Sequence, residues 1–303
     1  MRSLDRNSDP EDAVARIPTH APAMPADIDV SKPSAARAYD YYLGGSHNWK
    51  VDRDFGDRVL QRVPAVKDFA LENRAFLRRA VTWLAEQGVD QFLDIGSGIP
   101  TVGNVHEIAQ KVNPRAHTVY VDYEHIAVAH AQQILDTEDP RRERTDVIRA
   151  DLRDPVSVLE HPSTRRLLDF DRPVALLMVA VMHFVAPADG VDETMARYRD
   201  ALAPGSFLVM SHFTREGIPE DMQRQAAALE ELYADTPNPG YFRDRAEFTG
   251  LFGDLDMVPP GVVWLSDWRP DRPYDGDPAR TMVLAAVGRK AGTPLAAGRT
   301  PPA

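Results

Sequence analysis

Three acidic residues carry the most interpretable chemistry in the sequence, because each lies where a strand is expected to end. Asp94 opens an Asp-x-Gly-x-Gly motif at 94–98, and Asp122 and Asp151 end the next two apolar runs. Glycines in such a loop let the backbone turn sharply and let a ligand approach without an obstructing Cβ. An acid at the end of the second strand could accept hydrogen bonds from ribose hydroxyls, and one near an adenine edge could accept from the exocyclic amine. The pattern predicts a nucleoside-binding crevice.

A structural explanation competes with this interpretation at each position. One acid at a strand end is more often a helix N-cap or a loop residue than a ligand-binding group. Three acids in register with a glycine loop favour a ligand, because the carboxyl ends of consecutive strands in a doubly wound sheet line one crevice. The helix expected after the loop would add free N–H groups and a positive dipole end.

The glycine loop fits other nucleotide folds less well. A complete dinucleotide fingerprint has Gly or Ala three residues beyond its second glycine, where this chain has Thr101. The chain also lacks a second nucleotide-binding half, and no Gly-Lys-Ser/Thr P-loop follows a strand. A dinucleotide-dependent oxidoreductase stays as the weaker alternative, and ATP hydrolysis is not supported.

Alternating strand and helix patterns must position these residues. Apolar runs predict strands at 91–95, 118–122, 147–151, 173–181 and 206–211, with later strands at 262–264 and 281–287. Apolar residues at helical spacing fill the gaps, at 66–84, 105–112, 127–135 and 191–202. Asp154-Pro155 predicts a helix that begins at the proline. Continuous apolar strands are typical of a parallel sheet covered on both faces, so we expect one doubly wound α/β domain.

The domain boundaries follow from composition. Residues 1–30 contain four prolines, many charges and no periodic apolar pattern, which predicts a disordered leader. We expect an N-terminal helical arm over 31–64, a Rossmann-like domain over 65–288 and a flexible tail over 289–303.

Composition excludes several classes of protein. The chain has 303 residues, no cysteine, and a net charge of −11 from 35 basic and 46 acidic side chains. Disulfides, iron–sulfur clusters and thiol nucleophiles are therefore excluded, and so acidic a chain is a poor binder of nucleic acid. The longest apolar run, 174–185, is too short to span a bilayer. Without an apolar signal core at the N-terminus, the expected location is the cytoplasm.

Several motifs together resemble one known family. They are Pro33 to Gly45 (PSAARAYDYYLGG), Glu72 to Ala80, Phe92 to Thr101, Tyr120 to Tyr123, Ala150 to Pro155, Val179 to Val185, Ser211 to Phe213 and Trp268 to Pro270. Over about residues 31–288 the chain resembles a class I S-adenosylmethionine-dependent methyltransferase, and more narrowly an actinobacterial S-adenosyl methyltransferase family that was formerly a domain of unknown function. The resemblance implies a Rossmann-like sheet of seven strands whose last hairpin is antiparallel.

The resemblance also implies which residues bind the cofactor, S-adenosylmethionine, whose product is S-adenosylhomocysteine. The methionine part would be surrounded by Asp94, Gly96, Ser97 and Gly98. Asp122 would bind the ribose and Tyr123 would lie beside the adenine. Asp151 and Leu152 would frame the adenine edge, and the segment 179–183, which includes Val181, would face the sulfonium and the acceptor.

Two neighbouring residues on the first long helix are further candidates. Asn73 lies on an apolar stripe, and Arg74 follows it. A buried amide must find partners, so Asn73 bonds either backbone within the core or the cofactor carboxylate, which Arg74 could also hold.

Polar and aromatic residues outside the strand ends are candidates for the acceptor side. Tyr39, Tyr42 and His47 lie in an aromatic, glycine-rich stretch of the arm that predicts either a packed helix or a lid hinged at the glycine pair 44–45. His183 and His212 are expected to follow the fourth and fifth strands, where His183 could take a proton from the acceptor. A packing role is the alternative for both histidines. The last candidate is Tyr233, on the inner face of an amphipathic helix at 219–234.

These observations predict in-line methyl transfer from S-adenosylmethionine to a small-molecule acceptor, with no metal, nucleic-acid partner or membrane partner. The alternative is a regulatory or scaffold protein that binds the cofactor without turnover. The sequence leaves the oligomeric state open, with a homodimer as one candidate.

Overall fold

The computed structural model describes residues 31–100, 103–271 and 282–292. The predicted leader, Thr101 and the tail from residue 293 lie outside the described residues. The helices are α1 (Ala35–Tyr42), α2 (Lys50–Arg62), α3 (Ala65–Glu86), α4 (Val105–Val112), α5 (His125–Glu138), α6 (Pro155–Leu159), α7 (Pro162–Leu167), α8 (Val191–Ala201), α9 (Glu220–Ala234) and α10 (Arg245–Gly250). The strands are β1 (Gln91–Ile95), β2 (His117–Asp122), β3 (Thr145–Arg149), β4 (Ala175–Val179), β5 (Phe207–Phe213), β6 (Asp256–Met257), β7 (Val263–Trp264) and β8 (Val283–Arg289).

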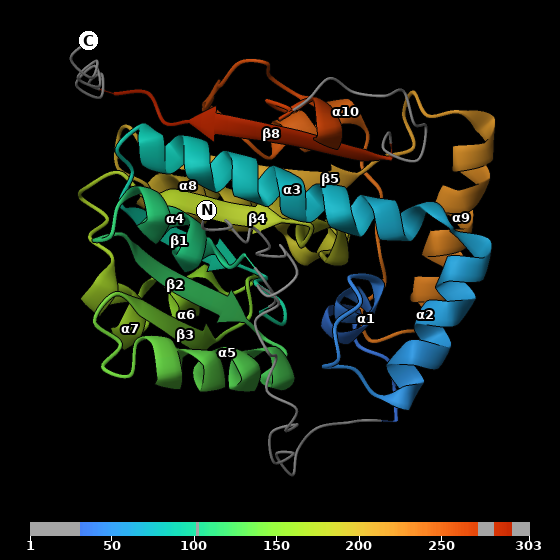
Figure 1. Ribbon diagram of the computed structural model, residues 1–303. Helices are drawn as coiled ribbons and strands as arrows, with labels where there is room; N and C mark the ends of the chain where they lie inside the picture. The colour runs from blue at the N-terminus through green and yellow to red at the C-terminus, as the bar shows by residue number, and fades with distance from the viewer. Residues whose placement is uncertain (1–30, 101–102, 272–281, 293–303) are drawn as a thin grey trace, which may run out of the picture.

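One mostly parallel sheet forms the centre of the molecule (Figure 1). Its strand order is β3-β2-β1-β4-β5-β8-β6, and β7 also pairs with β8. Strands β1 to β5 are parallel, whereas β8 is antiparallel to β5. The chain runs outward from β1 to β3 and then returns to β4 beside β1. This reversal opens a crevice at the carboxyl ends of β1 and β4, which is where doubly wound sheets bind ligands.

The strands are apolar throughout because both faces of the sheet are covered. In β4, Ala175 and Leu177 belong to one buried cluster, and Leu176 and Met178 to the other. Helices α3, α4 and α5 contribute to the first cluster, and α6, α7, α8 and α10 to the second. This alternation confirms the predicted doubly wound α/β architecture. The predicted start at Asp154-Pro155 is also confirmed, since Asp154 caps α6 and accepts from the Ser157 N–H at 3.3 Å.

The sheet differs from the expected seven strands in one detail. Its outer edge beside β8 is shared by β6 and β7, each only two residues long, so the described residues form eight strands. Strand β7 falls within the predicted 262–264, but β6 was not predicted. A two-residue strand is too short to produce a period-2 pattern, so the sequence carries no signal for it.

Six of the seven predicted strands differ from the observed ones by one or two residues at an end, and three of these differences move candidate residues. Strand β4 ends at Val179, which leaves Val181 in the following turn. Strand β5 continues to Phe213 because it pairs along its whole length with β8, with His212 opposite Leu284. His212 is therefore inside a strand rather than after it. Strand β3 ends at Arg149, which leaves Asp151 in the following loop. Strand β8 runs through Arg289, and the Lys290 N–H donates to the Ser206 carbonyl at 2.8 Å, so ordered structure extends past the predicted end at residue 288.

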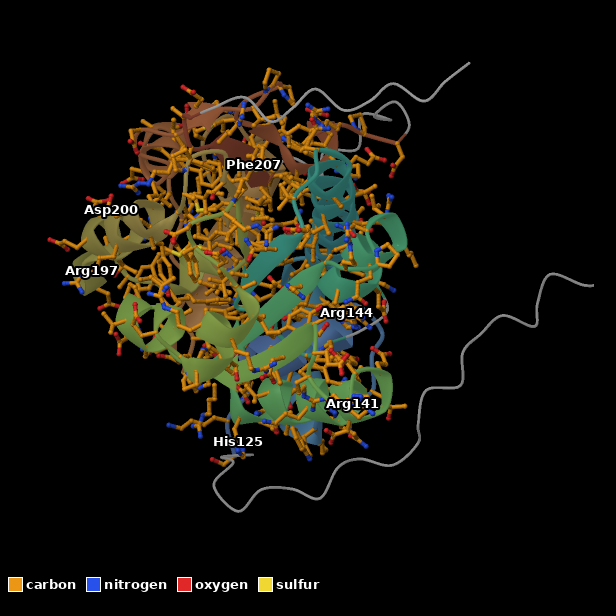
Figure 2. All side chains as sticks on the ribbon, turned by 90° about the vertical axis from the view of Figure 1, so that its left-hand side faces the viewer. His125, Arg141, Arg144, Arg197, Asp200 and Phe207 are labelled. Atoms are coloured by element: carbon orange, nitrogen blue, oxygen red, sulfur yellow. The ribbon has the colours of Figure 1, made fainter. Side chains whose placement is uncertain are left out.

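The predicted arm consists of α1 and α2, which lie beside α9 at the carboxyl ends of the strands (Figure 1). Charged side chains such as those of Arg141, Arg144, Arg197 and Asp200 lie on the outer surface away from this region (Figure 2). No helix in the described part of the chain has the length and apolar character needed to cross a membrane.

Candidate active site

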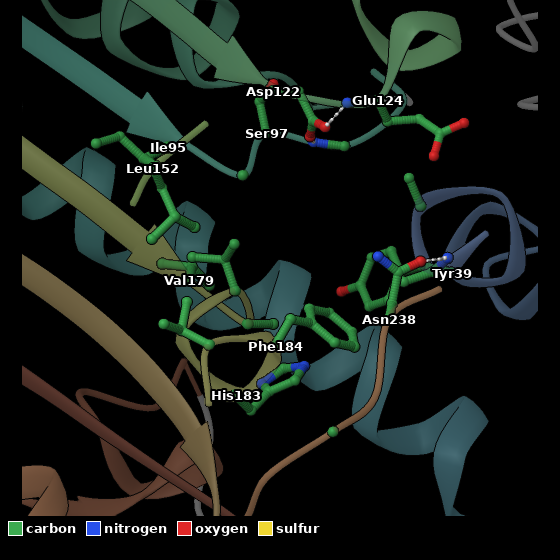
Figure 3. A pocket seen from close by; sticks show the side chains of 18 of the residues that line it. Tyr39, Ile95, Ser97, Asp122, Glu124, Leu152, Val179, His183, Phe184 and Asn238 are labelled. Carbon is green, nitrogen blue, oxygen red and sulfur yellow. Dashed lines mark hydrogen bonds between the residues drawn. The ribbon is translucent and has the colours of Figure 1, made fainter. Parts of the chain in front are cut away.

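A single cavity at the carboxyl ends of β1, β2 and β4 collects the predicted cofactor residues (Figure 3). Every position predicted to bind the cofactor lines it: Asn73, Arg74, Asp94, Gly96, Ser97, Gly98, Asp122, Tyr123, Asp151, Leu152 and Val181. Figure 3 shows Asp122 and Ser97 across the cavity from His183 and Phe184. We call the first side, Asp94 to Gly98 with Asp122 and Tyr123, the nucleoside end. We call the second side the aromatic end, and it is lined by Tyr42, Phe69, His183, Phe184, Phe213, Tyr233 and Phe242.

The two glycines of the loop, Gly96 and Gly98, are suited to their positions for different structural reasons. Gly96 has φ +72°, and a Cβ at this position would lie 2.2 Å from Cγ2 of Val181. A side chain at Gly96 would therefore both strain the backbone and displace the turn after β4. Gly98 has φ +65° and faces open space. Its N–H donates to Oδ2 of Asp122 at 2.8 Å.

The Asp122 carboxylate holds the nucleoside end together. Besides the bond from Gly98, its Oδ1 accepts from the Glu124 N–H at 2.8 Å. Burial raises the pKa of Asp122 to about 6, and the backbone hydrogen bonds oppose that rise. Each carboxylate oxygen retains a free lone pair, so the side chain can still accept from ribose hydroxyls.

Asp94 is also buried at this end, with 6% of its surface exposed. Burial raises the pKa of Asp94 to about 7, the positive charge of Arg74 opposes the rise, and Asp122 adds to it. A cationic group entering the cavity would favour the ionised form of both acids.

Asp151 has a different environment from the other two acids. It is half-buried and pairs with Arg153, whose Nη2 donates to Oδ2 at 2.6 Å. Hydrogen bonding from Arg153 lowers the pKa of Asp151. Leu152 lies beside it in the cavity wall, and Tyr123 is half exposed and accepts from the Asn238 amide through its hydroxyl.

The side-chain amide of Asn73 bonds two other side chains rather than the backbone. Its Nδ2 donates to the Tyr39 hydroxyl at 3.1 Å, and its Oδ1 accepts from Ser211 Oγ at 2.7 Å. Ser211 in turn accepts from the Ala180 N–H at 2.9 Å. Of the two roles expected for Asn73, backbone bonding in the core is not observed, because side chains from the arm and from β5 bond its amide. The result is a buried chain of hydrogen bonds from the arm to the turn after β4. The expected contact of Asn73 with the cofactor carboxylate stays a prediction.

That turn has an unusual backbone, because Ala180 has φ +56° although it is not glycine. Residues in this region persist only where the surroundings hold them, and they cluster at functional sites. Here the Ser211 hydroxyl holds the Ala180 N–H, and the turn presents Val181 to the glycine loop. Arg74, the neighbour of Asn73, donates to the Gly103 carbonyl at 2.8 Å and so ties α3 to the segment before α4.

His183 lies at the aromatic end, with 4% of its surface exposed. Its ring centroid is 4.3 Å from that of Phe184 and 4.8 Å from that of Phe213. Its Nδ1 is buried and has no hydrogen-bond partner among the described residues. Burial, followed by the nearby His212 and Arg243, holds the pKa of His183 well below its usual range.

Two of the residues predicted on the acceptor side do not line the cavity. His212 lies inside β5, where Nδ1 faces the Phe213 carbonyl at 2.8 Å and Nε2 faces Arg243 at 2.7 Å. His47 packs instead against His130 on α5, with ring centroids 4.1 Å apart. The hydrogen bond from the His47 N–H to Asp40 at 2.8 Å turns this segment away from the cavity. Tyr39, Tyr42, His183 and Tyr233 do line it.

The arm covers the cavity through contacts that are distant in sequence. Arg37 is almost fully buried, and it donates to Asp52 at 2.8 Å and to Glu124 at 3.0 Å. The Ala35 N–H donates to Oδ1 of Asn238 at 3.0 Å. The hydroxyls of Tyr42 and Tyr233 lie 3.1 Å apart. These contacts join α1 to the end of β2, to the segment after α9 and to α9 itself.

Sequence reasoning missed Glu124, Asn238 and Phe184, which all line the cavity. Glu124 directly follows the Tyr120 to Tyr123 motif, so extending that motif by one residue would have included it. Phe184 lies inside the Val179 to Val185 motif but was not singled out as a site residue. Asn238 lies in a Pro-Asn-Pro-Gly stretch, which indicates only a turn.

Among the described residues, one group has ligand atoms close enough for a metal: His106, Glu107 and Glu138. Each already has a partner in the fold. Glu107 accepts from the N–H groups at the start of α4, and His106 bridges Tyr120 and Glu138. The group lies outside the cavity lining.

Comparison with known proteins supplies the family. A family model described as S-adenosyl methyltransferase matches residues 21–291. The chain belongs to the S-adenosyl methyltransferase family. It is an S-adenosylmethionine-dependent methyltransferase with the Rossmann-like class I fold.

Two solved structures are similar to this methyltransferase over nearly their whole length. A proposed methyltransferase from Thermobifida fusca YX is 42% identical, with a TM-score of 0.80 over 87% of this chain and 97% of that one. A protein of the DUF574 family from Streptomyces avermitilis MA-4680 is 38% identical, with a TM-score of 0.79 over 86% of this chain and 98% of that one. A search of curated proteins gives no match.

The cavity fits the cofactor that the family implies. Gly98 leaves open space at the nucleoside end where a Cβ would intrude, and Asp122 keeps accepting capacity for ribose hydroxyls. The acidic pair Asp94 and Asp122 also suits a ligand that carries positive charge. When bound, S-adenosylmethionine supplies an electrophilic methyl group on a positively charged sulfur.

Proposed function

We propose that this methyltransferase acts on a small-molecule acceptor, by in-line transfer of the methyl group. The observation that carries the proposal is the closure of the cavity by the arm. Tyr39 and Tyr42 of α1, together with Tyr233 and Asn238, form its roof, and these residues bond one another or the core. A macromolecular acceptor would need an open groove, whereas this cavity suits a compact molecule.

In this proposal each end of the cavity has its own task. Asp122 and the glycine loop bind the nucleoside, Asp151 and Leu152 frame the adenine, and Arg74 with Asn73 lies near the carboxylate of the cofactor. Val181 and the turn after β4 separate the nucleoside end from the aromatic end. The chain then accelerates the reaction mainly by alignment and by exclusion of water.

His183 is the proposed proton acceptor. It is the imidazole that lines the aromatic end, its Nδ1 has no partner among the described residues, and its depressed pKa keeps it neutral. A neutral imidazole within reach of the acceptor can take the proton that methylation releases. His212 cannot do so, because the protein already engages both of its nitrogens.

The partners and location that we propose follow from charge and composition. A net charge of −11 argues against nucleic acid as acceptor. We infer a protein of actinobacterial type, on the basis of the two similar structures from Thermobifida and Streptomyces, and we propose a cytoplasmic location.

Calorimetry followed by a turnover assay tests this function. We expect S-adenosylhomocysteine to bind the protein and NAD to produce no heat. The protein is then incubated with methyl-labelled S-adenosylmethionine and an extract of small metabolites, and labelled products are separated by size. Label in a small molecule supports the proposal, label only in protein or nucleic acid contradicts it, and cofactor binding without any labelled product favours a regulatory role.

A further inference from the structure

The aromatic end of the cavity has a composition that restricts its occupant. Rings from four different parts of the chain surround it. Phe213 lies with its centroid 4.4 Å from Phe69 and 5.3 Å from Phe242, and Phe184 lies 6.3 Å from Tyr233. Aromatic rings favour other aromatic rings in offset or edge-on contact. The aromatic end should therefore favour a ligand with a planar, apolar ring system.

The aromatic end offers an ionic acceptor one charged side chain among the described residues, and that side chain is already engaged. Glu230 lines this end, and it accepts a hydrogen bond from Arg215. The other charged lining residues belong to the nucleoside end or the arm contacts. A charged acceptor would lose its hydration here without gaining an unpaired ionic partner, so we expect a neutral occupant.

His183 is the polar group left unsatisfied in this apolar surface. A buried polar atom without a partner destabilises the protein, so a hydrogen bond that a ligand supplies to it is favourable. The neutral imidazole has one N–H donor and one lone pair. An acceptor hydroxyl that points at this ring would donate a hydrogen bond to the imidazole lone pair. Its proton would then already lie between the two groups, where it can transfer to the imidazole.

Arg243 explains how His183 is held for this role. Its guanidinium is buried, and it donates to the carbonyls of Met182 and Val185, both at 2.9 Å. These two residues bracket His183, so Arg243 fixes the turn that carries the imidazole. Because arginine only donates, Nε2 of His212 must accept from it, which leaves Nδ1 of His212 to donate to the Phe213 carbonyl. His212 is thereby locked as a neutral ring, and the adjacent positive charge of Arg243 favours the neutral form of His183 as well.

We propose that the methyl acceptor is a neutral, planar aromatic molecule whose ring hydroxyl hydrogen-bonds to His183, and that Arg243 is the positioning residue that holds this imidazole ready. The proposal rests on the function proposed above. The acceptor O–H bond breaks and its proton goes to the imidazole, while an oxygen lone pair forms the new O–CH₃ bond. The methyl–sulfur bond breaks with its electron pair left on sulfur, so one positive charge leaves sulfur as one appears on His183.

Calorimetry on the protein saturated with S-adenosylhomocysteine tests the acceptor class. The probes are 2-naphthol, its methyl ether 2-methoxynaphthalene, the anion 2-naphthoate and the cation 2-naphthylmethylammonium. We expect 2-naphthol to bind about tenfold more tightly than the ether, because the ether cannot donate to His183. Both charged probes should bind at least about tenfold more weakly than 2-naphthol. Tighter binding of either charged probe, or equal binding of naphthol and ether, would overturn the proposal.

Substitutions assign the effect to named residues. His183→Leu should abolish the preference for naphthol over the ether, and His183→Gln, which keeps an accepting oxygen, should restore part of it. His117→Gln is the matched control, because His117 begins β2 at the opposite edge of the sheet. All three variants should bind S-adenosylhomocysteine as the unmodified protein does. If His183→Leu still prefers naphthol over the ether as strongly as the unmodified protein does, the acceptor proposal is contradicted. If the unmodified protein does not bind S-adenosylhomocysteine, the proposed function itself is contradicted.

The role of Arg243 is tested separately, by how the affinity for 2-naphthol depends on pH. In the unmodified protein, the affinity for 2-naphthol should stay constant between pH 6 and pH 8, because His183 remains neutral. Arg243→Met removes one of the charges that lower the pKa of His183, while burial and His212 still lower it, so the affinity should begin to fall at a higher pH than in the unmodified protein as His183 gains a proton. Arg243→Lys keeps the charge and should behave like the unmodified protein. If Arg243→Met does not fold, nitrogen-15 NMR of His183 in Arg243→Lys and in the unmodified protein decides, since a protonated ring in either at pH 6 is incompatible with the proposal.

Discussion

The two ends of the cavity are built in different ways. At the nucleoside end, backbone groups hold the site: the Gly98 and Glu124 N–H groups fix Asp122, and the Gly96 N–H bonds the Val121 carbonyl at 2.8 Å. At the aromatic end, side chains from β5, α3, α9 and the arm meet across long separations in sequence. The first end depends on local geometry that tolerates little change. The second depends on packing, which can be altered without moving the first.

Under the proposed function, this contrast separates cofactor binding from the choice of acceptor. A single cofactor requires one fixed shape, and backbone hydrogen bonds at the nucleoside end would supply it. An acceptor is recognised by ring size, shape and a few polar atoms. Substitutions at the nucleoside end should therefore affect cofactor binding, and substitutions at the aromatic end should affect acceptor binding alone.

The largest effect is expected from Gly96→Val. The new side chain would strain a backbone at φ +72° and collide with Val181, so affinity for S-adenosylhomocysteine should fall more than about 100-fold. Calorimetry measures this, with Gly250→Ala as control, because Gly250 lies at the end of α10 with nothing within 4 Å of its would-be Cβ. Retained affinity in Gly96→Val would show that the glycine loop does not form the cofactor site.

A smaller loss is expected from Asp122→Ala. The change removes the acceptor of two backbone N–H groups and the proposed ribose contact, so affinity for S-adenosylhomocysteine should fall about 10- to 100-fold. Asp151→Ala is the comparison, because this carboxylate is half-buried and already engaged by Arg153. We expect a loss of about threefold or less there. Equal losses of affinity in the two variants would argue against a special role for Asp122 at the end of β2.

We expect the arm to control how fast S-adenosylhomocysteine dissociates, rather than the geometry of the residues that bind it. Arg37→Met breaks the buried bonds to Asp52 and Glu124, so the roof should open more often and S-adenosylhomocysteine should dissociate about tenfold faster in stopped-flow measurements. Lys50→Met, which breaks only an exposed pair with Asp54, should have no measurable effect. An unchanged dissociation rate in Arg37→Met would mean that the arm is not a gate.

The smallest effect is a dependence of stability on pH. Burial raises the pKa of Asp94 to about 7 and that of Asp122 to about 6. Asp94 and Asp122 therefore hold protons in the folded protein that the unfolded chain releases near pH 4, so their contribution to the free energy of unfolding falls as the pH rises from about 4 to 7. Burial lowers the pKa of His130 to about 4, that of His212 to about 3 and that of His183 well below its usual range, so these three rings contribute stability that rises with pH over the same interval. The contribution of the acids is therefore measured as a difference in Tm between variants.

Asp94→Asn removes one of the two acids with a raised pKa, because the amide does not titrate. The Tm of Asp94→Asn relative to the unmodified protein should therefore rise by about 2–4 °C between pH 5 and pH 8. Asp136→Asn is the control, since this acid is exposed on α5, and its Tm difference should stay constant with pH. Differential scanning fluorimetry suffices for the comparison. A Tm difference for Asp94→Asn that stays constant or falls with pH would contradict the raised pKa of Asp94.

Sequence reasoning located the nucleoside end because its signals are local. The motif at 94–98, Asp122 and Asp151 each follow a recognisable strand, and topology brings strand ends together. The family motifs also placed Val181 and His183 correctly in the cavity wall.

The aromatic end and the roof were harder to predict because they depend on long-range contacts. Asn238 bonds Ala35 across 203 positions, and no local pattern encodes such a pairing. His212 was misplaced because pairing with β8 extends β5 by residues that the apolar run alone does not include. His47 was misplaced because its direction depends on the bond to Asp40.

The roof has a consequence for synthesis of the chain. Helix α1 leaves the ribosome before α9, so Tyr233 and Asn238, which hold it, are made about two hundred residues later. During most of translation the arm therefore has its contacts with α3 but lacks those with α9 and Asn238, and the cavity is completed only after α9 emerges. A nascent chain stalled before residue 220 should leave α1 open to protease, whereas one released beyond residue 242 should protect it.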